Sequence, residues 1–145
     1  MICGATGYIQ ADIRNPGLIL AEAAGTLDFG QPVAVMFLAV LHLITDAQDP
    51  AGIIAAVMDT VPSGSYLAIG HHTADIYPEL REFARRMSEL NPDFPALRGR
   101  QQVTGLFAGL DLVDPGVVQI SKWRPESDLD EHTAAALWGG VARKP

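Results

Sequence analysis

The sequence predicts an α/β fold with a mostly parallel sheet, because it contains two apolar runs with a helix between them. Residues 32–42 form an apolar run that ends in His42, too short to span a membrane and too uniformly apolar for a half-exposed strand. Residues 65–70 form a second such run. Between them, Asp49 and Pro50 begin a helix whose apolar residues recur at helical spacing. We therefore expect two neighbouring strands, buried on both faces and joined by a crossover helix.

The segment before the first run predicts one more strand and helix. Residues 8–13 have the composition of a short strand. Asn15 is a suitable N-cap, Pro16 fits the first helical turn, and Gly25 can end the helix.

After the second run, the sequence predicts two helices and two strands. Residues 78–90 have one apolar and one charged face, as in a surface helix, and residues 101–108 form a further helix. Residues 110–113 begin an edge strand that turns and continues through residues 117–120. Residues 135–142 supply the last strand, which we expect to be antiparallel to its neighbour.

The two runs and the helix between them supply the predicted core. Its members are Val33, Val35, Phe37, Leu38, Ile54, Val57, Leu67 and Ile69.

Length and composition predict one domain, residues 1–145, that is 48% hydrophobic and can bury a core. A net charge of −7 argues against a nucleic-acid or anionic-membrane partner. Cys3 is the single cysteine, so no internal disulfide can form, and the N-terminus lacks the pattern of a secretory signal. We therefore expect a cytoplasmic protein.

Residues 4–9 resemble the glycine turn of a dinucleotide-binding fold. Gln10 stands where a third glycine would be needed, and Asn15-Pro16 follows too soon for a helix that starts there. A small nucleotide-binding oxidoreductase is therefore only the third functional hypothesis.

Ligands of parallel sheets bind beyond the carboxyl ends of the strands, where this sequence has three histidines. The residues at these two ends are Ala39, Val40, Leu41 and His42, and then His71, His72 and Thr73. A histidine there can act as a general base or line a ligand pocket, although a hydrogen-bonded structural role is the alternative for His42. No further carboxylate or cysteine stands at metal-ligand spacing, so we predict no metal site.

Seven blocks resemble the C-terminal part of S-adenosylmethionine-dependent methyltransferases of an actinobacterial family of unknown function. They comprise residues 8–16, 32–42, 49–53, 62–67, 112–118, 123–125 and 139–145. The resemblance implies a class I methyltransferase-like (Rossmann-like) three-layer sandwich, truncated at the N-terminus, with an antiparallel C-terminal edge. It also implies S-adenosyl-L-methionine as the cofactor and a small molecule as the methyl acceptor.

The resemblance assigns roles by position. Asp12, with Ile13 beside it, occupies the place that contacts the adenine amino group. Ala39, Val40, Leu41 and His42 run past the methionine part of the cofactor, and His71, His72 and Thr73 line the acceptor pocket. No residue is assigned as catalytic, since methyl transfer from a sulfonium depends mainly on proximity and alignment.

Family members carry a glycine-bearing strand and turn before this region, and a second strand ending in an acidic residue. This chain has neither, so we expect cofactor binding to be weak or lost. The strand expected over residues 8–13 either pairs directly with the strand of residues 32–42 or stays loosely attached. The leading hypothesis is thus a methyltransferase or an inactive remnant of one. The alternative is a non-catalytic interaction or dimerisation module that uses an exposed sheet edge, for example as a homo-oligomer.

Overall fold

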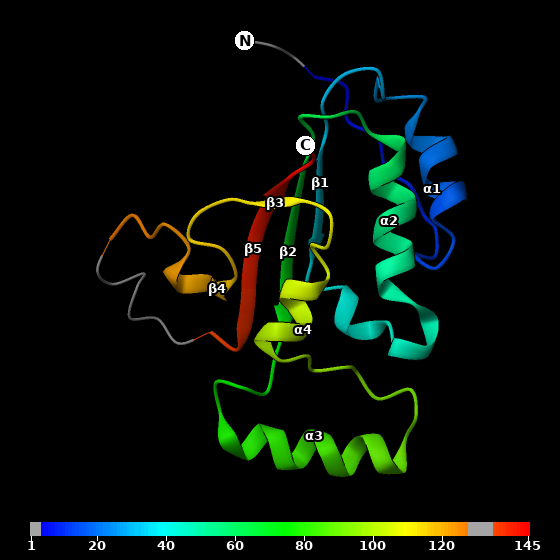
Figure 1. Cartoon of the computed structure of the whole chain (residues 1–145). Coiled ribbons are helices and arrows are strands. Elements are labelled where there is room, and N and C mark those ends of the chain that lie inside the picture. Colours follow the sequence, from blue (N-terminus) through cyan, green and yellow to red (C-terminus); the bar gives the residue numbers. More distant parts are fainter. Residues whose placement is uncertain (1–3, 128–134) are drawn as a thin grey trace.

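The computed structural model describes residues 4–127 and 135–145 and contains one five-stranded sheet (Figure 1). Its strands are β1 (Ala34–Leu38), β2 (Tyr66–His72), β3 (Asp111–Leu112), β4 (Val118–Gln119) and β5 (Leu137–Arg143). The order is β1-β2-β5-β3, and β4 also pairs with β5. β1 and β2 are parallel, whereas β5 is antiparallel to β2, β3 and β4. Four strands therefore share one direction, and the predicted antiparallel C-terminal strand is confirmed.

Four helices accompany the sheet: α1 (Pro16–Ala23), α2 (Pro50–Thr60), α3 (Pro78–Leu90) and α4 (Arg100–Gly105). Three short 3-10 turns, η1 (Leu41–Leu43), η2 (Asp46–Gln48) and η3 (Ile120–Lys122), complete the described structure. None of the helices in residues 4–127 and 135–145 is long and apolar enough to cross a membrane. Cys3 and residues 128–134 lie outside the described residues.

The two predicted cap-and-proline helix starts are confirmed. The Asn15 side chain accepts a hydrogen bond from the Leu18 N–H over 3.3 Å, and the Asp49 side chain accepts one from the Gly52 N–H over 3.0 Å. Each cap satisfies an N–H group that has no partner within its helix.

The core lies on one face of the sheet, where Phe37, Leu67 and Ile69 meet α2 and α4. The core residues of these two helices and of the turn after α4 are Ile53, Ile54, Met58, Val103, Leu106 and Phe107. Phe37, Ile54, Leu67 and Ile69 are buried as predicted, and Val33, Val35 and Val57 pack half-buried against them.

The opposite face of the sheet is largely open, which contradicts the prediction that residues 32–42 are buried on both faces. Met36 is 63% exposed, Tyr66 is 41% exposed, and Leu38, expected in the core, is 59% exposed. β1 is also an edge strand and spans only Ala34–Leu38. Ile120 packs against Gly70 and Gly139 on this face and leaves the part formed by β1 uncovered.

The strand predicted over residues 8–13 does not form. A strand requires a neighbour for its backbone groups, and this segment pairs with none of the described strands. Tyr8 is 89% exposed, and the segment ends in a turn in which the Asn15 N–H donates to the Asp12 carbonyl over 2.9 Å. Of the two arrangements considered for this segment, the loosely attached one is observed.

Candidate functional site

The chain turns sharply where β1 ends, at the carboxyl end of the parallel pair. The Ala39 N–H donates to the Gly70 carbonyl over 2.8 Å, and Ala39 has a φ of 52°, which is uncommon for a residue other than glycine. The chain then enters η1, in which Leu41 is fully buried. Leu41 is therefore a core residue, whereas Ala39 is exposed and Val40 and His42 are half-buried.

His42 and His72 form a contact pair at this end of the sheet. Their ring centroids lie 4.5 Å apart at an interplanar angle of 78°, so the contact is edge-on. Among the residues that the structure describes, buried His42 Nδ1 has no hydrogen-bond partner. Burial lowers the pKa of His42, and the neighbouring His72 lowers it further. A neutral imidazole with an unpartnered nitrogen can accept a proton or a hydrogen bond.

His71 has both ring nitrogens engaged inside the protein. Its Nδ1 lies 2.7 Å from the His72 carbonyl oxygen, and its Nε2 lies 3.0 Å from Arg98 Nη1. A guanidinium can only donate, so Nε2 accepts and Nδ1 carries the proton. Burial is the main cause that lowers the pKa of His71 to about 4, so the ring is neutral at pH 7. His71 therefore supports the site from within the fold.

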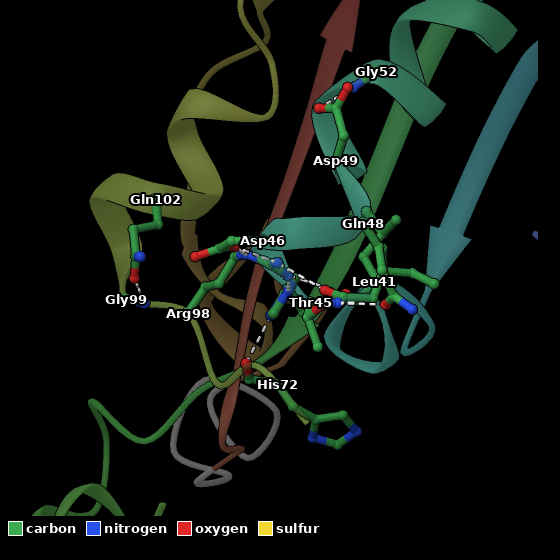
Figure 2. A network of polar contacts seen from close by, with 12 residues as sticks. Leu41, Thr45, Asp46, Gln48, Asp49, Gly52, His72, Arg98, Gly99 and Gln102 are labelled. Atoms are coloured by element: carbon green, nitrogen blue, oxygen red, sulfur yellow. Dashed lines mark hydrogen bonds and ion pairs between the residues drawn. The ribbon is translucent and has the colours of Figure 1, made fainter. Parts of the chain in front are cut away.

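Arg98 is buried. Its hydrogen bonds connect the turn after β1 to the end of β2 (Figure 2). Its guanidinium donates to the Leu41 carbonyl over 3.0 Å and to the Ile44 carbonyl over 2.8 Å. It also bonds Asp46 Oδ1 from Nε and Nη2, over 3.1 and 2.7 Å. Arg98 could not be anticipated from the sequence, because nothing in the loop before α4 distinguishes a buried arginine from an exposed one.

Thr73 is also buried, and its hydrogen bonds stabilise the segment that follows β2. Its N–H donates to the Ala136 carbonyl over 3.0 Å, and its hydroxyl accepts from the Asp75 N–H over 3.1 Å. Asp75 in turn accepts from the Arg100 N–H and the Trp138 indole N–H, each over 3.0 Å. Of the three residues assigned to the acceptor pocket, His72 is the one that is half exposed.

Asp12 is exposed and already forms an ion pair with Arg14. Arg14 Nε and the Arg14 backbone N–H each donate to Asp12 Oδ1 over 2.9 Å. These hydrogen bonds lower the pKa of Asp12 to about 2. An adenine amino group would share this carboxylate with Arg14. Ile13, next to it, packs half-buried against the core.

The glycines of residues 4–9 do not form a phosphate-binding turn. Neither Gly4 nor Gly7 has a positive φ, and a Cβ on Gly7 would lie 3.0 Å from the Thr26 hydroxyl. The segment lines a hollow beside the end of α1 together with Glu22, Ala23 and Leu27. Residues 4–9 therefore do not supply the phosphate-binding loop that the oxidoreductase hypothesis requires. Within residues 4–127 and 135–145, no three metal-ligating side chains converge.

The fold is that of the Rossmann-like methyltransferases, with candidate site residues at the carboxyl ends of its parallel strands. The chain belongs to the family described as S-adenosyl methyltransferase, whose model matches residues 2–145. No curated protein matches the sequence.

Solved structures agree with this assignment. A DUF574 family protein from Streptomyces avermitilis is 37% identical with a TM-score of 0.86, and the match covers 98% of this chain and 56% of that one. A methyltransferase candidate from Thermobifida fusca is 27% identical with a TM-score of 0.78, covering 92% and 52%. An O-methyltransferase family protein from Burkholderia thailandensis, at 14% identity and a TM-score of 0.57, covering 95% and 35%, shares the fold alone. The chain thus spans little more than half the length of the first two relatives.

Proposed function

We propose that this chain forms the acceptor side of an S-adenosylmethionine-dependent methyltransferase. The observation that carries the proposal is the pairing of His42 with His72 at the carboxyl ends of β1 and β2, where buried His42 Nδ1 has no hydrogen-bond partner in the described part of the chain. The position agrees with the rule that ligands of α/β sheets bind at this end of the strands.

The described residues fit the cofactor in part. Asp12 and Ile13 would meet the adenine, and Ala39 to His42 would pass the methionine side. Two parts of a complete cofactor site have no equivalent among the described residues. One is the set of backbone N–H groups of a glycine turn, and the other is a carboxylate that binds the ribose hydroxyls. We therefore expect the chain by itself to bind the cofactor weakly.

The cofactor supplies a methyl group on a sulfonium, and the chain's own residues would orient the acceptor beside it. His42 is neutral at pH 7 and could accept the proton that an acceptor hydroxyl or amine loses. Arg98 and His71 would hold the turn that carries His42, since Arg98 bonds the carbonyls of Leu41 and Ile44 on either side of it.

Calorimetry with S-adenosylhomocysteine tests this proposal on two proteins: this chain, and the chain preceded by the N-terminal strands of the Streptomyces avermitilis relative. Each lost polar contact costs about 1 to 3 kcal/mol, so the short chain should bind at least about 100-fold more weakly. Histidine side-chain NMR of the extended protein should show the His42 resonances shift on binding, with those of His71 as the internal control. Micromolar binding by the short chain, or an unshifted His42, would contradict the proposal.

A second candidate function is self-association through β1, favoured by its free edge and by the exposed side chains of Met36, Leu38 and Tyr66. β1 carries no charged residue that would repel a second copy. Sedimentation analysis should then show a dimer that Leu38→Lys dissociates and Phe83→Lys, on α3, leaves intact. A monomeric wild-type chain at high concentration would exclude this function.

A further inference from the structure

A cavity of about 340 Å³ lies between α3 and the segment of residues 92–97 that returns from it. Thr45 and Ala74 line it from the body of the protein, and Ala84 and Ser88 line it from α3. The cavity is of the size that small-molecule sites in proteins usually have.

The cavity adjoins the candidate site. Ala96, one of its lining residues, donates its N–H to the His42 carbonyl over 2.7 Å. Ala74 follows His72 by two residues, and Thr45 follows His42 by three. Figure 1 shows α3 lying beyond the end at which β2 leaves the sheet. Neither His42 nor His72 lines the cavity, but the segments that follow them continue into its wall.

The lining is largely apolar with two cations. Phe94, Pro95 and Leu97 contribute apolar surface from the returning segment, and Arg81 and Arg85 come from α3. The Arg85 guanidinium is already held by Glu82, over 2.8 and 2.9 Å, and by Glu89.

Arg81 is the less engaged cation. Its guanidinium lies 3.8 Å from Asp75 Oδ1, beyond hydrogen-bond distance. The other carboxylate oxygen of Asp75 already accepts two hydrogen bonds, from Arg100 and Trp138. Within the described residues, the Arg81 guanidinium thus makes an ion pair with Asp75 but no hydrogen bond, and its donors can bind an anion in the cavity.

We infer that this cavity binds a small apolar molecule carrying one carboxylate, of the size of an aromatic acid. The ring would pack between Ala84, Phe94 and Leu97, and the carboxylate would bind Arg81 as a charge-assisted pair. The inference rests on the proposed function, because it names the chemical class of the methyl acceptor.

The test is an NMR titration of the full chain with benzoate, benzamide and acetate, without any cofactor. Benzoate should bind saturably and shift the Arg81 Nε and Ala84 resonances. Benzamide, which lacks the charge, and acetate, which lacks the ring, should each bind at least ten-fold more weakly. Equal binding of benzoate and benzamide, or shifts that map to another part of the protein, would overturn the inference.

A pair of variants on the same helix separates specific from general electrostatic attraction. Arg81→Gln should weaken benzoate binding at least ten-fold. Arg86→Gln, which removes an equal charge from a residue that pairs with Glu82 outside the cavity, should change it less than two-fold. Equal effects of the two variants would refute the assigned site. Since no cofactor is present, this result is independent of whether the chain binds S-adenosylhomocysteine.

Discussion

Arg98 Nη1 lies 3.0 Å from His71 Nε2 inside the protein, and this hydrogen bond joins the loop before α4 to the end of β2. It fixes the His71 tautomer, because the arginine can only donate. The same guanidinium holds the turn that carries His42. The stability of the candidate site should therefore depend on Arg98.

Replacing Arg98 with Met should lower the free energy of unfolding by about 3 kcal/mol, because the Leu41 and Ile44 carbonyls and His71 lose their donor. Urea denaturation measures the change. The control is Arg86→Met on the exposed face of α3, which should cost less than about 0.5 kcal/mol. A loss below about 1 kcal/mol for Arg98→Met would show that water replaces these bonds without penalty.

Stability should fall as the pH drops from about 6.5 to 4. The pKa of His71 is about 6.5 in the unfolded chain and about 4 in the fold, so the unfolded state binds more protons within that window. The loss should approach about 3 kcal/mol at pH 4, and His42, whose pKa is also lowered, adds in the same direction. Unfolding free energies of wild type and His71→Gln across pH 4 to 8 test this, since the variant should show a shallower slope. If the unfolding free energies of the two proteins change in parallel with pH, His71 does not contribute to the pH dependence of stability.

Phe37 and Met36 are neighbours on β1 that point to opposite faces of the sheet. Phe37→Ala should cost about 3 to 5 kcal/mol, because its side chain is buried against the core. Met36→Ala should cost under about 1 kcal/mol, because that side chain is largely exposed. Chemical denaturation of the two variants compares the faces, and similar losses would contradict the one-sided core.

The Asp49 side chain caps α2 (Figure 2), and its backbone is left-handed, at a φ of 53°. Asp49→Ala should lower stability by about 1 to 2 kcal/mol, since it removes the bond to the Gly52 N–H and places alanine in an unfavourable conformation. Asp49→Gly should cost less, because glycine adopts that φ freely. Thermal melts would rank the stability of the two variants. A glycine variant less stable than the alanine variant would refute the contribution of the left-handed backbone.

The sequence predicted the elements that depend on local signals. Asn15-Pro16 and Asp49-Pro50 start helices because cap and proline act within one turn. The sequence-based predictions failed where an element depends on another segment of the chain that pairs with it or covers it. Residues 8–13 have strand composition but pair with none of the described strands, and Met36 and Leu38 are apolar although they stay largely exposed.

The candidate site was predictable only in outline. Because parallel strands end at one edge of the sheet, the histidines after two successive strands could be expected to meet, and His42 and His72 do. Arg98 could not be anticipated, since it contacts Leu41, Ile44 and Asp46 more than fifty residues away and no periodic pattern marks it. Nor could composition tell that His71 is enclosed while His72 is half exposed.

Helix α3 buries none of its residues, and this has a consequence for ligand affinity. A thirteen-residue helix is marginally stable in water on its own, so α3 can unfold locally while the sheet remains intact. Its backbone amides should then exchange hydrogen faster than those of β2. The apparent affinity of the adjoining cavity is its intrinsic affinity multiplied by the fraction of molecules in which α3 is folded. Substitutions that raise helix propensity on its solvent side should therefore tighten binding without touching the ligand.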